Sequence, residues 1–265
     1  MQPAANYKVS DPLSPQSLSV VIITRNAATQ LAACLESVAF ADEVLVVDGG
    51  SSDGTAELAV EHGARVVQKE WLGFGRQKQF AVESARHDWV LCLDADERVS
   101  ETLRASILAV LAAPAAQAYA MPRCNRFMGH WLRHGEGYPD WSLRLFDRRH
   151  ARWSEDPVHE KVLTDAPVAR LEGDLLHDSA ETLASYLEKQ NRYTSIQAEA
   201  LLKAGVRASV AQLLLSPALR FLKFYVLRLG FLDGVPGLVH IAIGCCNSFH
   251  KYAKLTGLQR DRDRM

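Results

Sequence analysis

The sequence predicts an α/β protein, with a mainly parallel sheet flanked by helices and a helical region toward the C-terminus. Three observations lead to this prediction. Continuous apolar runs of strand length alternate with amphipathic segments four times between residues 18 and 99, which is the pattern of a doubly wound parallel sheet. Polar residues stand where several of these runs end. From residue 181 onward apolar residues recur every three or four positions instead, which indicates helices.

The four predicted strands are apolar runs that are too continuous for strands with one face in water. Such runs are typical of parallel strands buried on both faces. The segments between them carry apolar residues at helical spacing, and Gly63 is a typical residue just after a helix end. The predicted strands are LSVVIIT (18–24), EVLVVD (43–48), ARVVQKE (64–70) and WVLCLD (89–94), and the predicted helices lie within 28–40, 55–63 and 75–86.

This rhythm breaks between residues 121 and 176, where aromatic residues, Gly, His and Arg are frequent. We expect short strands of mixed direction and functional loops there. The predicted organisation is a disordered leader at 1–16, the α/β domain at 17–178, a helical region at 179–258 and a tail at 259–265. The leader has no apolar stretch of the kind found in signal peptides, so we expect the protein on the cytoplasmic side.

Composition narrows the class of protein. The chain has 265 residues, 48% of them hydrophobic and 23% charged, and a net charge of −1. This balance gives no reason to expect a nucleic-acid partner. The five cysteines form no CxxC pair and are odd in number, which favours reduced thiols in a cytoplasmic protein without a disulfide framework or a zinc site.

The segment from about Ser209 to Leu255 is apolar almost all round, with basic residues interspersed. Its longest run without a formal charge is interrupted by polar residues and Pro236, which makes it short and polar for a membrane span. We therefore favour helices that lie in the plane of a membrane surface, apolar side in lipid and Lys/Arg toward anionic headgroups. The alternatives are packing on the α/β domain or on a second subunit, and a true span.

Several polar residues converge on one edge of the predicted sheet. Right-handed crossovers place the carboxyl ends of parallel strands along a single edge, where ligands bind in such sheets. The residues expected at this edge are Thr24, Arg25, Asn26, Asp48, Asp94 and Asp96. The sequence therefore predicts a binding site there.

Asp94 and Asp96 form a D-x-D pair directly after a buried strand. Mg²⁺ and Mn²⁺ take oxygen ligands and are typically held by one or two protein carboxylates together with substrate phosphates. The pair therefore predicts a divalent metal, Mn²⁺ or Mg²⁺, that holds a diphosphate. The alternative for the motif alone is a solvated loop or a helix N-cap. The sequence has no G-x-G-x-x-G after the first strand and no GxxxxGK[ST], which disfavours a dinucleotide site and a P-loop.

Three stretches, "LSVVIITRNAATQLAACLESV", "EVLVVDGGSSDGTAELA" and "WVLCLDADERVS", resemble family 2 glycosyltransferases of the GT-A fold. "GYPDWSLRLF", "DPVHEKV" and "GDLLH" are similar to a narrower group, the lipopolysaccharide inner-core β-1,4-glucosyltransferases of Gram-negative bacteria. The resemblance covers nearly the whole chain after about residue 17 and includes the apolar, basic C-terminal region.

The resemblance implies roles for the residues at the predicted edge. Thr24, Arg25, Asn26 and Asp48 would contact the nucleoside of a UDP-sugar, although Asp48 has the alternative of capping its own turn. Many relatives carry a second acid in the turn where this chain has Gly49, so a base contact from that position is in doubt.

The resemblance also assigns the diphosphate and metal contacts. Asp94 would approach the ribose or a metal-bound water, and Asp96 would ligate the metal. His177 in "GDLLHDS" matches the position of a further metal ligand, with a structural histidine as the alternative. Lys78 and Arg144 would neutralise the diphosphate, and surface salt bridges are their alternative.

An inverting transfer needs one general base beside the acceptor hydroxyl. The subgroup motif "VHE" favours Glu160, whereas the x-E-D segment common in the superfamily points to Asp156. Asp140 is a further candidate. Tyr138, Asp140 and Trp141, in the loop "HGEGYPDW", are candidate contacts of the acceptor sugar, and core packing is the alternative for the two aromatic residues.

The sequence thus predicts a metal-dependent inverting glycosyltransferase. It would move a hexose, with glucose favoured, from a UDP-sugar donor to a lipid-linked saccharide acceptor, with heptose of the lipopolysaccharide inner core favoured. We expect it to be peripheral on the inner face of the cytoplasmic membrane. One alternative is a glycosyltransferase that acts on polyprenyl phosphate or another polysaccharide, and a second is a membrane-associated scaffold without catalytic activity.

Overall fold

The computed structural model describes residues 15–156, 160–179 and 182–264. The predicted leader therefore lies almost entirely outside the described residues. The chain divides into two compact units: Met1–Pro122 with Trp141–Leu176, and Arg123–Asp140 with His177–Met265. The second division falls close to the predicted boundary at residue 178, but the structure groups the segment Arg123–Asp140 with the C-terminal helices and not with the α/β domain.

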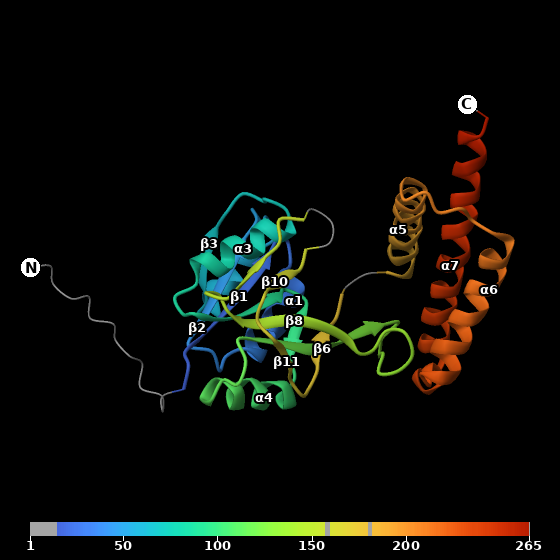
Figure 1. Ribbon diagram of the computed structural model, residues 1–265. Helices are drawn as coiled ribbons and strands as arrows, with labels where there is room; N and C mark the ends of the chain where they lie inside the picture. The colour runs from blue at the N-terminus through green and yellow to red at the C-terminus, as the bar shows by residue number, and fades with distance from the viewer. Residues whose placement is uncertain (1–14, 157–159, 180–181, 265) are drawn as a thin grey trace, which may run out of the picture. The chain divides into compact units, whose positions relative to one another are not determined.

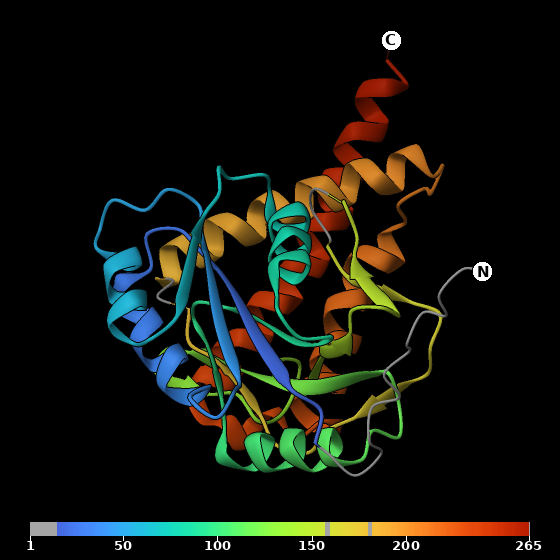
Figure 2. The same ribbon diagram turned by 90° about the vertical axis from the view of Figure 1, so that its left-hand side faces the viewer.

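The sheet runs in the order β3-β2-β1-β4-β8-β6-β12-β5, and its central strands are drawn in Figures 1 and 2. The first four strands along the chain are parallel, as the sequence predicts, and β1 lies between β2 and β4. β8 then pairs antiparallel with β4. The strands are β1 Leu18–Thr24, β2 Glu43–Asp48, β3 Arg65–Gln68, β4 Trp89–Asp94, β5 Glu97–Val99, β6 Ala118–Phe127, β8 Asp140–Asp147 and β12 Leu175–His177.

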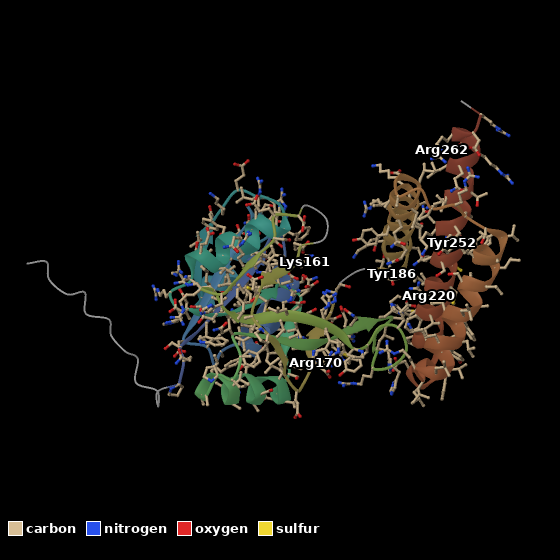
Figure 3. The ribbon with its side chains drawn as sticks, in the orientation of Figure 1. Lys161, Arg170, Tyr186, Arg220, Tyr252 and Arg262 are labelled. Carbon is tan, nitrogen blue, oxygen red and sulfur yellow. The ribbon has the colours of Figure 1, made fainter. Side chains whose placement is uncertain are left out.

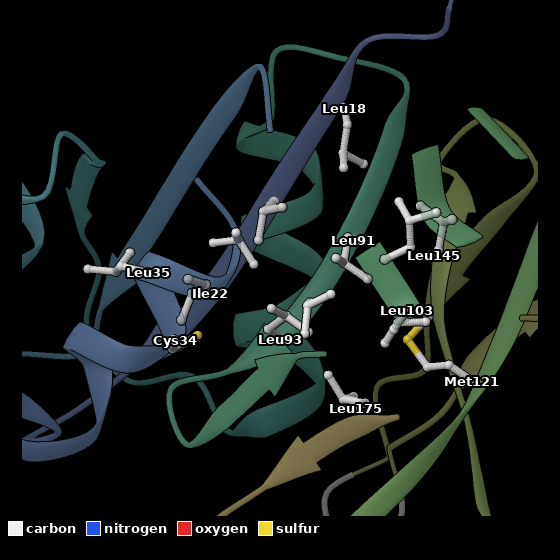
Figure 4. Close-up of a cluster of buried hydrophobic side chains, with 14 of the residues drawn as sticks. Leu18, Ile22, Cys34, Leu35, Leu91, Leu93, Leu103, Met121, Leu145 and Leu175 are labelled. Atoms are coloured by element: carbon white, nitrogen blue, oxygen red, sulfur yellow. The ribbon is translucent and has the colours of Figure 1, made fainter. Parts of the chain in front are cut away.

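Both faces of β1 are buried, which explains its continuous apolar run. Val20 and Ile22 point into one core with residues of α1 and α4, whereas Val21 and Ile23 point into a second core with residues of α3. Figure 4 shows the first core, where Leu91 and Leu93 of β4 join it. The helices are α1 Ala28–Ser37, α2 Thr55–Glu61, α3 Phe74–Ser84 and α4 Glu101–Ala112.

Short strands of mixed direction follow in the first unit, as predicted. β9 (Ala151–Trp153) and β10 (Val162–Thr164) form an antiparallel ribbon. β11 (Val168–Arg170) pairs parallel with β6. All five cysteines of the chain are free. Three of them are buried, and burial is the largest cause of the raised pKa of Cys92, which reaches about 12.

The second unit is mainly helical. α7 packs against both α5 and α6, and it extends to Arg262, beyond the predicted end at residue 258, although Gly257 lies in its last turns. A buried carboxylate joins the segment Arg123–Asp140 to the helical part of this unit. Asp233 accepts hydrogen bonds from the backbone N–H groups of Arg133 and His134. The elements are β7 His130–Trp131, α5 Leu183–Lys203, α6 Val210–Phe221, the π-helix η1 Leu222–Leu227, the 3₁₀ helix η2 Gly230–Asp233 and α7 Gly234–Arg262.

Candidate active site

The parallel register brings the polar strand ends together at one edge of the sheet. Thr24 of β1 is aligned with Asp48 of β2, and Ile23, next to it, is aligned with Asp94 of β4. Three of the residues predicted for this edge therefore stand on adjacent strands at the same level. This is the position where parallel α/β sheets bind ligands.

Asp48 caps its own turn. It is fully buried, and its carboxylate accepts hydrogen bonds from the backbone N–H of Gly50 at 3.2 Å, from that of Ser51 at 3.0 Å, and from the Ser51 hydroxyl. The turn-capping interaction weighed in the sequence analysis is thus present. These hydrogen bonds hold the backbone of the Gly/Ser-rich turn after β2 in one conformation at this edge of the sheet.

Asn26 links the turn after β1 to the turn after β2. Its backbone adopts a left-handed conformation with φ of 53°, which asparagine tolerates better than most residues. Its side-chain oxygen accepts from the Ser52 N–H at 2.9 Å, and its own N–H donates to the Ser51 hydroxyl at 2.8 Å. The neighbouring Arg25 is exposed. Sequence reasoning missed these two serines, whose signal is their place in the turn directly after Asp48.

The Thr24 hydroxyl and the glycine at position 49 give this edge two further features. The Thr24 Oγ1 is buried and has no hydrogen-bond partner among the described residues. A Cβ atom at Gly49 would stand 2.8 Å from Cε3 of Trp71 and 3.2 Å from the Thr24 carbonyl oxygen. The acid that many relatives carry at this position therefore has no room here unless Trp71 moves.

A buried charge network surrounds Asp94. The Lys78 ammonium lies 3.0 Å from Asp94 Oδ1 and 3.3 Å from Glu160 Oε1. Arg144 Nη2 lies 3.0 Å from Asp94 Oδ2 and 3.0 Å from Glu97 Oε1. Lys78 and Arg144 are 4% and 6% exposed, so the salt bridges considered as their alternative are present but are buried and do not lie at the surface. Their contact with a diphosphate stays a prediction.

Glu97 completes this network and was missed by sequence reasoning. It is fully buried, and it accepts hydrogen bonds from Arg144 and from the backbone N–H of Asp94. Burial alone would lower the pKa of Arg144, but the charges of Glu97 and Asp94 raise it above its usual range. The signal that could have found Glu97 is an acid placed directly after the D-x-D pair, at the start of β5.

The two candidate bases differ in their surroundings. Glu160 is half-buried and contacts the Lys78 ammonium, whereas Asp156 is exposed. A Cβ atom at Gly75 on α3 would overlap the Ser154 carbonyl oxygen, so a glycine there lets the chain between β9 and β10 approach α3. The structure thus brings Glu160, and not the side chain of Asp156, into the charge network of Asp94. His159 lies outside the described residues.

Asp96 lies half-buried in the turn between β4 and β5. His177 belongs to the second unit, where its Nδ1 is 2.7 Å from Asn125 Oδ1. Their pairing as metal ligands therefore stays a prediction. Among the described residues, no group of three or more His, Cys, Asp and Glu side chains is arranged to hold a metal ion.

The acceptor candidates fall in different units. Asp140 and Tyr138 belong to the second unit, where Asp140 pairs with Arg123 at 2.8 Å. Trp141 belongs to the first unit and is 40% exposed, with the Arg170 guanidinium 4.4 Å from the centroid of its ring. An exposed ring under an arginine is not core packing, so this alternative is wrong for Trp141.

Comparison with known proteins agrees with this geometry. The family model "Glycosyl transferase family 2" matches residues 19–168. The lipopolysaccharide core biosynthesis glycosyltransferase LpsC of Rhizobium meliloti is 29% identical over 246 residues, which cover 90% of this chain and 91% of that protein. An uncharacterized glycosyltransferase of Rickettsia typhi is 31% identical over 256 residues, which cover 92% of this chain and 88% of that protein.

A solved structure supports the fold. The mannosyltransferase PcManGT of Pyrobaculum calidifontis, in complex with GDP-Man and Mn²⁺, is similar with a TM-score of 0.51 at 16% sequence identity, and the match covers 98% of this chain and 92% of that one. The predicted GT-A fold and the predicted resemblance to lipopolysaccharide core glycosyltransferases are both confirmed. With a family model that spans more than half of its residues, this chain belongs to glycosyl transferase family 2.

Proposed function

We propose that the protein transfers a hexose, glucose, from a UDP-sugar with inversion to a lipid-linked acceptor, the heptose of a lipopolysaccharide inner-core precursor. One observation carries the proposal: Asp94, Lys78 and Glu160 form one network at the carboxyl edge of the sheet. That edge thus combines a metal-binding motif, a cation for a diphosphate and a base. The similarity to LpsC supports the class of acceptor.

The donor set at the end of β4 fits a divalent cation. Asp94 and Asp96 offer carboxylate oxygens, the ligands that Mn²⁺ and Mg²⁺ prefer, and one or two such groups suffice when substrate phosphates complete the shell. Asp96 would ligate the ion, with His177 as the further ligand, and Asp94 would approach the ribose or a metal-bound water. A bound ion would stabilise the negative charge that develops on the departing diphosphate.

The chemistry assigned to this chain's own residues is a proton transfer and charge stabilisation. The acceptor hydroxyl oxygen attacks the anomeric carbon of the sugar, a new C–O bond forms there, and the bond from that carbon to the diphosphate breaks, so UDP leaves. Glu160 accepts the hydroxyl proton. Lys78 and Arg144 provide positive charge beside Asp94 for the leaving diphosphate.

The second unit supplies a surface suited to a lipid-linked acceptor. Val210–Leu227 is a helical segment of 18 residues with mean hydropathy 1.4, none of it buried, and it is long and apolar enough to cross a membrane by length and composition alone. We favour contact in the plane of the cytoplasmic leaflet, because 18 residues are at the lower limit for a span. Lys223 is exposed in the same segment and suits anionic headgroups.

A transfer assay with the full-length protein tests the proposal. Radiolabelled UDP-glucose is incubated with a heptose-terminated lipid A–core precursor in detergent, with Mn²⁺ or with EDTA. We expect labelled product with Mn²⁺ only, and an inverted anomeric linkage by NMR. If the protein transferred the sugar to polyprenyl phosphate and not to the core precursor, the proposed acceptor would be wrong. If a folded protein neither transferred the sugar nor bound a nucleotide sugar, the proposal would be wrong, and the alternative of a scaffold without catalytic activity would be favoured.

A further inference from the structure

The second unit contains two adjoining cavities, and of the residues that line them only His177 and Asp140 have a role in the site predicted above. One has a volume of about 480 Å³ and the other about 340 Å³. Asn125, Tyr186 and His240 line both of them. Every residue that lines either cavity belongs to the second unit. Together they offer the space for a small saccharide, within the usual range of ligand pockets.

Tyr186 and His240 give the shared wall two rings, and Phe127 lines the first cavity beside them. The ring of Phe127 meets Tyr186 at 5.3 Å and His240 at 5.2 Å between centroids, both edge-on. Burial lowers the pKa of His240, so its ring is neutral at pH 7. Aromatic faces of this kind are suited to the apolar C–H face of a pyranose ring. Tyr186 is labelled on α5 in Figure 3.

Amide side chains stand beside these rings. Asn125 contacts His177 at 2.7 Å, and Asn247 donates to Gln190 at 2.8 Å. Each amide carries two donor hydrogens and an oxygen with two lone pairs, which is more capacity than these bonds use. Such groups, fixed in orientation by a neighbour, suit the hydroxyl groups of a sugar, which both donate and accept.

The first cavity carries an excess of positive charge. Its lining contains the three cationic side chains Arg123, Arg126 and Lys189 and one carboxylate, Asp178. Arg126 Nη1 lies 2.8 Å from Asp178 Oδ2, and Arg123 is held by Asp140 at 2.8 Å. Both guanidinium groups are therefore oriented before a ligand arrives, and arginine recognises phosphate and carboxylate groups through paired N–H donors.

In the lining of the second cavity, the charges of Arg220 and Glu136 balance each other. Arg220, labelled in Figure 3, pairs with Glu136 and donates to the Ser248 hydroxyl at 3.1 Å. A Cβ atom at Gly244 on α7 would overlap Glu136 Oε2 and stand 3.0 Å from Arg220 Nε. The pair thus fits against α7 only because residue 244 has no side chain.

From these contacts we propose that the joined cavities of the second unit bind one saccharide of the acceptor, a pyranose bearing an anionic group, a phosphate or a carboxylate. The ring packs on Tyr186 and Phe127 with its hydroxyls toward the amides, and the anion lies beside Arg123 and Arg126. The inference rests on the proposed function and deepens it, because it states which chemical feature of the acceptor is recognised.

The test uses full-length protein and a deacylated, heptose-terminated core oligosaccharide as acceptor, in phosphorylated and dephosphorylated forms. Arg126→Gln and Tyr186→Ala should each raise the KM for the phosphorylated acceptor by roughly 10- to 100-fold, with kcat and UDP-sugar affinity within about twofold of the wild type. The controls are Arg192→Gln and Tyr193→Ala on α5, whose side chains line neither cavity and which should keep the wild-type KM.

Further arms identify the anion and exclude misfolding. If the effect of Arg126→Gln disappears with the dephosphorylated acceptor, the recognised anion is phosphate, and if it persists, it is a carboxylate. Tyr186→Phe keeps the ring and should restore the KM. A wild-type KM in folded Arg126→Gln and Tyr186→Ala, or an equal rise in the controls, would overturn the proposed saccharide site. Failure of the wild type to bind any UDP-sugar would instead overturn the proposed function.

Discussion

Lys78 Nζ and Glu160 Oε1 lie 3.3 Å apart, although 82 positions separate the two residues in the sequence. The same ammonium contacts Asp94 at 3.0 Å. One buried cation therefore joins the D-x-D strand end to the candidate base. This contact distinguishes Glu160 from Asp156, which is exposed. In the proposed mechanism it would link the proton acceptor to a cation for the diphosphate.

Glu160→Gln should reduce kcat for transfer by roughly 10²- to 10⁴-fold, the usual contribution of a general base. UDP-sugar affinity should stay within about twofold of the wild type, because the amide keeps the volume of the carboxyl. Steady-state transfer kinetics together with a donor titration measure both quantities. The matched control is Glu155→Gln, an exposed acid that pairs with the exposed Arg76. A larger loss of kcat in Asp156→Asn than in Glu160→Gln would identify Asp156, and not Glu160, as the general base.

Arg144→Met should lower the free energy of unfolding by about 3–5 kcal/mol, because it leaves the buried Glu97 without its cationic partner. The double variant Arg144→Met/Glu97→Gln should recover part of this loss, since the uncompensated charge is gone. Urea denaturation of the wild type, both single variants and the double variant gives the coupling. Additive losses would show that the two side chains do not stabilise one another.

Asp233→Asn should weaken the second unit by about 1–3 kcal/mol at pH 7. Burial alone would raise the pKa of Asp233, but hydrogen bonds from the His134 side chain and from the backbone N–H groups of His134 and Arg133 lower it below its ordinary value. The folded pKa thus lies below the unfolded value of about 3.9. The stabilisation is present above that value and is lost as pH falls through the folded pKa.

Unfolding free energies of the wild type and Asp233→Asn, measured between pH 7 and pH 3, check this sign. The difference between the two proteins should be constant near neutral pH and shrink at the acid end. A difference that grew as the pH fell would mean that the Asp233 carboxylate is not the stabilising form.

Leu215→Glu/Leu219→Glu should reduce binding to vesicles of anionic phospholipid by at least about tenfold, because each exposed leucine that enters lipid contributes about 1.5–3 kcal/mol. The two side chains are 57% and 62% exposed on α6. Vesicle flotation measures the bound fraction. Leu108→Glu, at a 44% exposed leucine of α4 in the first unit, is the control. If the double variant floated with vesicles as well as the wild type, the prediction that this face of α6 contacts the membrane would be wrong.

The strands and the ligand-binding edge were predictable because their causes are local. A parallel strand covered on both faces needs an unbroken apolar run, and β1 shows why, with Val20 and Ile22 in one core and Val21 and Ile23 in the other. Once four such strands are parallel, the polar residues after each of them must meet at one edge.

The rest depends on contacts between distant parts of the chain. Glu97 is recognisable as a buried partner only when Arg144, 47 positions later, folds against it. The grouping of Arg123–Asp140 with the C-terminal helices is equally non-local, since Asp233 binds the backbone of Arg133 across 100 positions. Spacing and periodicity carry no information about such pairings.

We propose that the edge with Asp94 and Asp96 binds a nucleotide sugar through a divalent metal. Calorimetric titration of UDP-glucose into the wild type and Asp96→Ala, each with Mn²⁺ and with EDTA, tests it most directly. We predict binding by the wild type with Mn²⁺ that is lost with EDTA and weakened at least about tenfold in Asp96→Ala. Equal binding by a folded Asp96→Ala, or by the wild type in EDTA, would contradict the account.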